Sequence, residues 1–586
     1  MAAGSTYGDA ARLYTAETGA DGHDILIVLN KNENMPFDFR EVIAEDCELE
    51  FAGYSSKYAR MAYQRTAVFI FLKAFYDIFG YDAVEYVNVD FTADEAFYIN
   101  YKLNAGERSG AGSSEVCGMS GNCGGAGVSE ASCGVPDIGG CGSTSGIDGQ
   151  EALVENIKSR MLEYVNRGLG INKVTVSLQT ALSIFRKQHM PDKEKLIRYR
   201  RTSRINLYEL DGMYDYFYGS MCMNTSDIVL FDLRCFADGF VLILPDAGDA
   251  SRLADFAPSV KVFEVEKASS DWARKVGVKN LADLNDAICV NGGKDVLLMQ
   301  EAFFEGQLAE VASIVIKEGK KFVLLAGPSS SGKTTTAYRL AIQLRAQGKK
   351  VSIISADNYF YEMDKRVLDA NGKPDFESIK AVDTDQFNED MLRLLNGERV
   401  EIPRFNFITQ KREYNGNFIT LGADDVMIIE GIHSLNDEFS VKIPDESKFR
   451  LYVSALTQLN IDEHNRIPTT DSRLLRRMVR DYLTRGYSAA DTISRWPDVR
   501  DGEEKNIFPY QDNADMVINS ALVYEAAVIK PFAERLLFSI APGTPEYPEA
   551  QRLLKFLDYV MTMTPEKVPG NSLLREFIGD SYIDYD

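Results

Sequence analysis

A short loop, GPSSSGKT at 327–334, carries the clearest chemistry in the sequence, because it matches the phosphate-loop pattern G-x-x-x-x-G-K-[ST]. Backbone N–H groups of such a loop converge on a phosphate chain, and its glycines let the backbone approach closely. Lys333 can reach the β- and γ-phosphates, and the Thr334 hydroxyl can bind Mg²⁺. We therefore predict ATP and Mg²⁺ as cofactors. The residues expected to bind ATP are Gly327, Pro328, Ser329, Ser330, Ser331, Gly332, Lys333, Thr334 and Thr335.

Two carboxylates stand where short apolar runs end. Asp357 follows the run at 351–355, and Glu430 follows the run at 426–429. In an open α/β sheet, ligands bind in the crevice beyond the carboxyl ends of the strands. We predict that Asp357 is a catalytic base that accepts the proton of an attacking hydroxyl, and that Glu430 holds Mg²⁺, commonly through water. A purely structural alternative for Asp357 is a helix N-cap.

Cationic side chains gather in DSRLLRRMVRDYLTRGYS at 471–488, a predicted helix that contains Arg473, Arg476, Arg477, Arg480 and Arg485. Arg477 and Arg480 are three residues apart, so they share one face. The functional interpretation is a lid whose arginines close on phosphates and neutralise the charge that develops during transfer. The alternative is a solvated helix paired with nearby acids.

Strands and helices must position these groups. The run 322–326 predicts a buried strand before the loop, and the apolar residues after the loop have helical spacing. Further strands are expected at 351–355, 426–429, 449–455 and 514–522. Five strands separated by helices predict an α/β fold with a parallel sheet in three α/β/α layers.

The first half of the chain is predicted to be α+β. A helix is expected at 60–80, one or two strands at 84–103, and an antiparallel sheet layer at 205–245. Two helices that turn at Gly292-Gly293 connect this half to the phosphate-loop strand. The stretch 105–146 is rich in Gly and Ser, which is typical of a disordered insertion. A metal or redox site is the less favoured alternative, because its cysteines lack C-x₂-C spacing and no His lies among them; they are Cys117, Cys123, Cys133 and Cys141.

Composition limits the class of protein. A chain of 586 residues is too long for one core, and its apolar fraction of 45% is that of a soluble globular protein. No apolar run is long enough for a membrane span, and the N-terminus does not resemble a secretory signal, so a cytoplasmic location is expected. The net charge of −23 argues against broad nucleic-acid binding. Four further cysteines are expected to be small apolar residues: Cys47, Cys222, Cys235 and Cys289.

Residues 320–538 resemble the uridine kinase and phosphoribulokinase family of P-loop kinases, through motifs such as AGPSSSGKTT, DFES, IPRFNF, IIEGIH and GEEKNIFPYQ. The resemblance implies that Asp357 is the catalytic aspartate, Glu430 the magnesium-associated glutamate and Glu377 the acid that holds the ribose hydroxyls. It also implies a base pocket lined by Phe405 and Phe407, a nucleoside contact from Arg412, and lid arginines at Arg477, Arg480 and Arg485.

The sequence departs from the family pattern at positions near the base or the phosphates. Phe405 and Gln410 stand where uridine kinases typically have Tyr and His, and Phe360 stands where they have Tyr. Lid positions of the family fall on Tyr487 and Arg495. Gln410 can still pair with a base edge, because its amide offers both a donor and an acceptor.

The N-terminal half resembles part of the threonyl-tRNA synthetases. The segment 54–262 is similar to their editing-type domain, through DGMYDYFYGSM and FDLRCFADGFVLILP, and the segment before it is similar to their TGS domain. Editing in that family depends on a histidine-rich cluster, but this chain contains only four His residues, none of them in the helix at 60–80. The resemblance therefore implies a binding or structural role for this half.

Together these readings predict a TGS-like domain at 1–57, an editing-like domain at 58–262 with the insertion at 105–147, a helical connector at 263–319, a kinase domain at 320–545 and a helical tail at 546–586. The whole arrangement resembles bacterial nucleoside kinases with a synthetase-like N-terminal half. The predicted function is ATP- and Mg²⁺-dependent phosphorylation of the 5′-hydroxyl of a nucleoside, uridine or cytidine first. The alternatives are a kinase for another sugar or nucleoside and a tRNA-binding regulatory protein with a nucleotide switch. The expected partner is a small-molecule nucleoside, and a homo-oligomer is compatible with the sequence.

Overall fold

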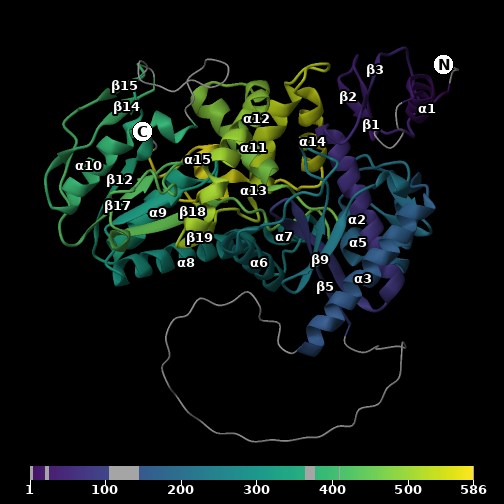
Figure 1. Cartoon of the computed structure of the whole chain (residues 1–586), viewed down its shortest axis with the longest axis horizontal. Helices are drawn as coiled ribbons and strands as arrows, with labels where there is room; N and C mark the ends of the chain where they lie inside the picture. Colours follow the sequence, from purple (N-terminus) through teal and green to yellow (C-terminus); the bar gives the residue numbers. More distant parts are fainter. Residues whose placement is uncertain (1–3, 20–24, 105–143, 363–376, 408, 585–586) are drawn as a thin grey trace, which may run out of the picture.

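The computed structural model describes residues 4–19, 25–104, 144–362, 377–407 and 409–584. The cysteine-bearing stretch 105–143 lies outside the described residues. The chain begins with a helix whose N-terminus has a capping box formed by Thr6 and Asp9, and a small antiparallel sheet of order β2-β1-β3 follows (Figure 1). The elements are α1 (Tyr7–Thr18), β1 (Ile27–Asn30), β2 (Met35–Phe37) and β3 (Leu49–Ala52).

A long buried helix, α2 (Lys57–Phe79), organises the next part of the chain. From Thr66 to Tyr76 its side chains are buried on every face, including Phe69, Phe71 and Phe75 at 0% exposure, because α2 packs against β1, α3 (Thr144–Arg167) and β4 (Val84–Ala93). The four-stranded sheet has the order β4-β5-β10-β9, and the three-stranded sheet has the order β6-β7-β8. The α+β prediction for this half is therefore confirmed at the level of its elements. They are β4 (Val84–Ala93), β5 (Ala96–Leu103), α3 (Thr144–Arg167), β6 (Asn172–Ser177), α4 (Leu178–Lys187), α5 (Pro191–Arg198), β7 (Arg204–Leu210), β8 (Met213–Asp215), β9 (Asp232–Phe236) and β10 (Gly239–Ile243).

Three helices lead from this half to the phosphate-loop strand. They are α6 (Val260–Lys275), α7 (Leu281–Asn291) and α8 (Lys294–Lys317). Gly292 and Gly293 have φ of 71° and 72°, so the predicted glycine turn between α7 and α8 is present. α8 packs against α9 (Lys333–Ala346), the helix that follows the phosphate loop.

The second half contains the predicted parallel sheet, with the strand order β12-β17-β11-β18-β19 (Figure 1). Successive side chains of the central strand point to opposite faces. Val323 and Leu325 pack in the core that includes Leu340 of α9, whereas Phe322 and Leu324 pack in a second core with Phe387 of α10 (Thr384–Leu395). A sheet with helices on both faces is the expected three-layer arrangement. Its strands are β11 (Phe322–Ala326), β12 (Lys350–Ser355), β17 (Asp425–Glu430), β18 (Lys448–Ser454) and β19 (Met516–Asn519).

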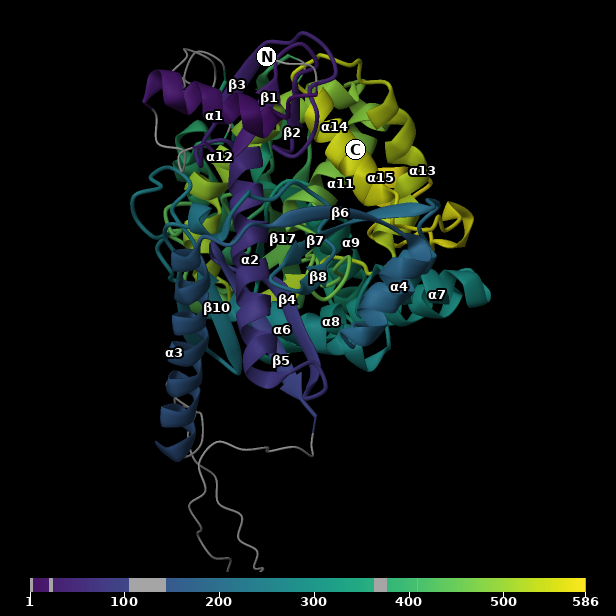
Figure 2. The same ribbon diagram turned by 90° about the vertical axis from the view of Figure 1, so that its right-hand side faces the viewer.

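The C-terminal segment folds back over the rest of the molecule. α14 (Tyr547–Leu557) packs on α13 (Glu525–Phe538) and lies beside β2 of the N-terminal sheet, as Figure 2 shows. Farther along, the short helix α15 (Arg575–Ile578) packs on α11 (Thr469–Arg485), the arginine-rich helix. The end of the chain therefore contacts both halves.

A buried charge cluster joins the two halves. Lys193 of α5 lies 2.7 Å from the carboxylate of Asp215 and 3.0 Å from that of Asp462, and all three side chains are 0% exposed. His464 adds a contact of 2.6 Å between its Nδ1 and Asp215. Asp462 and His464 belong to the loop between β18 and α11, whereas Lys193 and Asp215 belong to the first half.

Two further sequence expectations concern solubility and cysteines. Within the described part of the chain, none of the helices combines the length and apolar character that a membrane span requires. Cys222 is buried as expected, and Cys47 and Cys235 are partly buried. Cys289, near the end of α7, is exposed, so it does not pack as a small apolar residue as expected.

Candidate active site

The phosphate loop has a backbone that its glycines make possible. At Gly327 an added Cβ would lie 2.0 Å from the carbonyl oxygen of Val453, so only glycine fits against β18. Gly332 caps the N-terminus of α9 with φ of 83°, and Ser330 also has a positive φ, 60°, which is strained for a serine. The loop therefore aims the N-terminus of α9 and its N–H groups at one point, where an anion is stabilised.

Polar atoms of the loop lack partners that a phosphate chain could supply. The hydroxyl groups of Ser330 and Ser331 are buried and make no hydrogen bond to any residue that the structure describes. Lys333 donates to the carbonyl oxygens of its own loop, Gly327 at 2.9 Å and Pro328 at 3.2 Å. Because buried polar groups are normally paired, the two hydroxyls fit a site for phosphate oxygens.

Asp357 and Glu430 lie at the ends of adjacent parallel strands. Glu430 is the register partner of Ser355, and Asp357 follows Ser355 in the short helix Ala356–Tyr359. The pKa of Asp357 is raised to about 6, mainly by burial. Lys333 lowers it and the nearby Glu377 raises it, and the value of about 6 includes both effects. Ser355, not Asp357, caps this short helix, since its hydroxyl accepts from the Asp357 N–H. The N-cap alternative for Asp357 is therefore wrong.

Glu430 has the electrostatic environment of a cation ligand. Burial raises its pKa to about 7, Lys333 opposes the shift, and the negative charges of Asp357 and Glu576 add to it. Several carboxylates near one site are stabilised by a divalent cation. Across the described ranges, no group of three or more His, Cys, Asp or Glu side chains could hold a metal ion by itself. The residues present therefore fit Mg²⁺ held jointly with phosphate oxygens, its usual mode in phosphate sites.

The arginines of α11 form two sets with different partners. Arg473 and Arg476 are buried and pair with acids: Arg473 forms two hydrogen bonds with Glu503, and Arg476 forms an ion pair with Glu525. Both also donate to phosphate-loop carbonyls, Arg473 to Ser329 at 3.2 Å and Arg476 to Ser330 at 3.4 Å. These two arginines and their acids hold the loop in place.

The second set gathers around one carboxylate. Arg477, Arg480 and Arg485 lie 3.3, 3.0 and 3.3 Å from the buried carboxylate of Asp481. Arg477 also donates to the Ser329 hydroxyl at 2.7 Å. Three guanidinium groups share a single acid here, so the cluster keeps positive charge beside the phosphate loop.

Aromatic rings gather beside the short helix that carries Asp357. They come from the hairpin of β14 (Arg404–Asn406) and β15 (Lys411–Glu413). The ring of Phe405 lies 5.7 Å from that of Phe360 and 5.1 Å from that of Phe407, and Phe405 is buried while Phe407 is 58% exposed. Gln410 is at the hairpin tip with φ of 56°.

Arg412 and Glu377 both lie near Asp357. The guanidinium of Arg412 donates to the carbonyl oxygens of Tyr359 and Phe360 at 3.0 and 3.2 Å, so it is tied to the backbone that follows Asp357. Glu377 packs against Gly502 of α12 (Ala489–Asn506), where an added Cβ would lie 2.9 Å from its Cγ. The structure thus places four of the residues predicted to bind substrate around the short helix that carries Asp357: Glu377, Phe405, Phe407 and Arg412.

Sequence reasoning missed the contribution of the C-terminal segment. One carboxylate oxygen of Glu576 accepts hydrogen bonds from the Thr335 N–H at 3.3 Å and the Thr335 hydroxyl at 2.5 Å. Leu573 covers Gly332, and the ring of Phe577 lies 5.2 Å from the guanidinium of Arg476. No motif marks these residues, because only the tertiary fold brings them to the loop.

Comparison with known proteins gives a consistent picture for the second half. Residues 322–525 match the Phosphoribulokinase / Uridine kinase family. The match covers the five strands, the phosphate loop and the arginine helix. Residues 322–525 are a phosphoribulokinase/uridine kinase family domain. The resemblance to this family is therefore confirmed for this part of the chain.

The relatives share limited identity. The uridine kinase of Saccharomyces cerevisiae is 28% identical over 199 residues, which are 33% of this chain and 36% of that protein. The uridine kinase of Staphylococcus haemolyticus is 27% identical over 195 residues, 33% of this chain and 84% of that protein. A solved structure described as a "possible uridine kinase" from Bacillus stearothermophilus has 18% identity and a TM-score of 0.25, and covers 36% of this chain and 98% of its own.

Proposed function

We propose that this protein is an ATP- and Mg²⁺-dependent kinase that phosphorylates the 5′-hydroxyl of a nucleoside, with uridine or cytidine as the first candidates. One observation carries the proposal: the carboxylates of Asp357 and Glu430 lie on adjacent strand ends and both interact with Lys333 of the phosphate loop. Acceptor activation, cation binding and phosphate binding are thereby combined in one crevice. The comparisons support a nucleoside or sugar kinase and leave the acceptor open.

The proposed mechanism assigns a task to each group of residues. ATP with Mg²⁺ supplies the transferable phosphoryl group, and Thr334 and Glu430 would hold the cation. Asp357 would orient the acceptor hydroxyl and accept its proton, since its pKa of about 6 leaves it largely ionised at neutral pH. Lys333 would pair with phosphate oxygens in place of its own loop carbonyls. Arg477 and Arg480 would neutralise charge in the transition state, and Arg485 would help to hold ATP.

The acceptor is proposed to lie between the aromatic rings and Glu377. Phe405 and Phe407 offer apolar faces for a base, and Gln410 offers an amide for its edge. Glu377 would accept hydrogen bonds from the ribose hydroxyls. Arg412, tied to the backbone after Asp357, would contact the nucleoside and keep this backbone in position.

For the first half, we keep the synthetase-like assignment and the domain boundaries as proposals. No catalytic role follows for it, since the histidines on which editing depends are missing from α2. The different-class alternative is a tRNA-binding regulator in which the nucleotide site is a switch.

The deciding experiment is a phosphotransfer assay of the full chain with ATP and Mg²⁺ against uridine, cytidine, adenosine, guanosine and ribulose 5-phosphate. Turnover of a pyrimidine nucleoside, lost in Asp357→Asn while ATP binding is kept, supports the proposal. Reaction of ribulose 5-phosphate alone would overturn the choice of acceptor. Salt-sensitive tRNA binding without any phosphotransfer would favour the regulator.

A further inference from the structure

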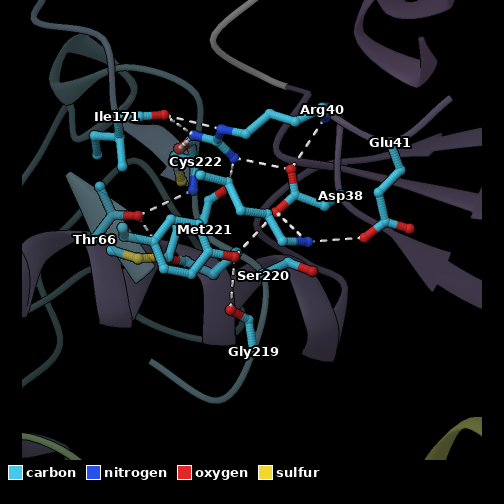
Figure 3. A network of polar contacts seen from close by, with 12 residues as sticks. Asp38, Arg40, Glu41, Thr66, Ile171, Gly219, Ser220, Met221 and Cys222 are labelled. Carbon is cyan, nitrogen blue, oxygen red and sulfur yellow. Dashed lines mark hydrogen bonds and ion pairs between the residues drawn. The ribbon is translucent and has the colours of Figure 1, made fainter. Parts of the chain in front are cut away.

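A second polar cavity lies in the first half, away from the phosphate loop. It has a volume of about 340 Å³ and is lined by β2, β6, β7, the segment 216–220 and α14. Figure 3 shows a polar network beside it that includes the lining residues Glu41 and Gly219 together with Asp38 and Arg40. No phosphate-loop residue lines it, so it is separate from the candidate active site.

The charges that line this cavity are strongly unbalanced. Four cationic side chains face it, those of Lys173, Arg200, Arg204 and Lys555, and the only acid among its lining residues is Glu41. Glu41 already pairs with Lys173 at 2.9 Å. The chain as a whole carries a net charge of −23, so the accumulation of cations is specific to this cavity.

Two of these cations form no ion pair, although the charge of Glu41 lies near Lys555. Among the residues that the structure describes, neither Arg200 nor Lys555 forms a side-chain hydrogen bond or an ion pair, and the Nε of Arg200 is buried without a partner. Arg200 instead stacks on Tyr559 at 4.3 Å, with its guanidinium fixed in place. Burial and the nearby Arg65, Lys173 and Arg200 lower the pKa of Lys555 to about 8.

Neighbouring arginines have hydrogen-bond or ion-pair partners, unlike Arg200 and Lys555. Arg40 forms an ion pair with Asp38 at 2.9 Å and donates to the carbonyl oxygens of Ile171 and Cys222, as Figure 3 shows. Arg65 donates to the carbonyl oxygen of Ser220 at 2.5 Å. The guanidinium groups of Arg40 and Arg65 are held by protein acceptors, whereas Arg200 and Lys555 have N–H donors left for a ligand.

We propose that this cavity binds a phosphorylated small molecule. A guanidinium with free N–H groups beside an ammonium suits phosphate oxygens, and such an anion would offset the repulsion among the cations. The concave shape, with the hydroxyl of Thr202 and the amide of Asn206 on its wall, fits a small ligand better than a nucleic-acid backbone. This inference does not rest on the proposed kinase activity.

Calorimetric titration of the full chain with pyrophosphate tests it, because pyrophosphate probes both anion sites. We expect two sites in the wild type. Lys555→Gln and Arg200→Gln should each weaken one site at least tenfold, Lys333→Met should remove the other, and Lys555→Arg should retain both. The matched control is Arg186→Gln, which removes a charge from an exposed arginine paired with Glu194 outside the cavity.

Further titrations identify the type of ligand, and several results would contradict the proposal. Parallel titrations with inorganic phosphate and UTP show whether a bare anion or a nucleotide binds more tightly at the site that Lys555→Gln weakens. Cavity variants that bind pyrophosphate like the wild type, or complete loss of binding in Lys333→Met, would overturn the proposal. So would binding of a short RNA at this site without pyrophosphate binding. If Arg200→Gln lowers the melting temperature, Lys555→Gln decides, since Lys555 makes no hydrogen bond or ion pair with any described residue that its loss would break.

Discussion

The carboxylate of Glu576 accepts a hydrogen bond from the hydroxyl of Thr335 over 2.5 Å, although 241 residues separate them in the sequence. The same oxygen also accepts from the Thr335 N–H, at the N-terminus of α9. An anionic side chain thus takes donors that a phosphate group would use in this loop. ATP binding must therefore displace Glu576 or place its charge beside a phosphate.

We expect Glu576→Gln to bind ATP more tightly than the wild type. Removing one like-charge contact near a surface is worth on the order of 1 kcal/mol, which is about a fivefold lower Kd. Equilibrium binding of ATP to the full chain, with and without Mg²⁺, measures it. Glu566→Gln removes an exposed acid from the same segment and should leave the Kd unchanged. Weaker ATP binding by Glu576→Gln only with Mg²⁺ would show instead that Glu576 helps to hold the cation.

The dependence of kcat/KM on pH should follow the ionisation of Asp357. Because its pKa is raised to about 6, the carboxylate is protonated below pH 6 and cannot accept the acceptor's proton. We expect kcat/KM to rise with pH through about 6 and about 7, the pKa values of Asp357 and Glu430, and to level off near pH 8, where both carboxylates are ionised. Asp357→Asn should lower kcat by about 10²–10⁴-fold while ATP binding persists. A profile that is flat between pH 5 and 8 would contradict the assignment.

The two aromatic residues of the acceptor region should separate binding from stability. Phe407 is 58% exposed, so Phe407→Ala should raise the KM for the nucleoside with little change in melting temperature. Phe405 is 4% exposed, and its truncation should cost about 3–5 kcal/mol of unfolding free energy as well. Thermal unfolding and acceptor kinetics on both variants make the comparison. Unchanged KM in Phe407→Ala would place the base elsewhere.

The buried Lys193 should be far more important for stability than its neighbour Lys195. Lys193→Met leaves Asp215 and Asp462 buried with less counter-charge, which should cost about 3–5 kcal/mol. Lys195 pairs with Asp283 but is 45% exposed, so Lys195→Met should cost less than about 1 kcal/mol. Denaturant unfolding measures both, and equal losses would refute the importance of the buried cluster.

Local patterns were enough to predict the kinase-like half. Each strand of the parallel sheet is a short apolar run, and the glycine loop and Asp357 have fixed positions relative to those runs, so spacing alone placed them. The roles of the five helix arginines could not be separated, because Arg473 and Arg476 differ from Arg477 only in which acids the fold brings near them. Glu576 was beyond sequence reasoning for the same reason: its contact depends on how a distant segment folds back.

The buried charge cluster around Lys193 affects how the chain can be divided into fragments. The fragment 322–525 contains Asp462 and His464 but lacks Lys193 and Asp215. Expressing it alone would therefore expose charged side chains that are buried and paired in the full chain. A gene trimmed to its recognisable kinase portion should therefore yield a protein that misfolds or aggregates. On this expectation, the segment that matches the family is shorter than the segment needed for folding.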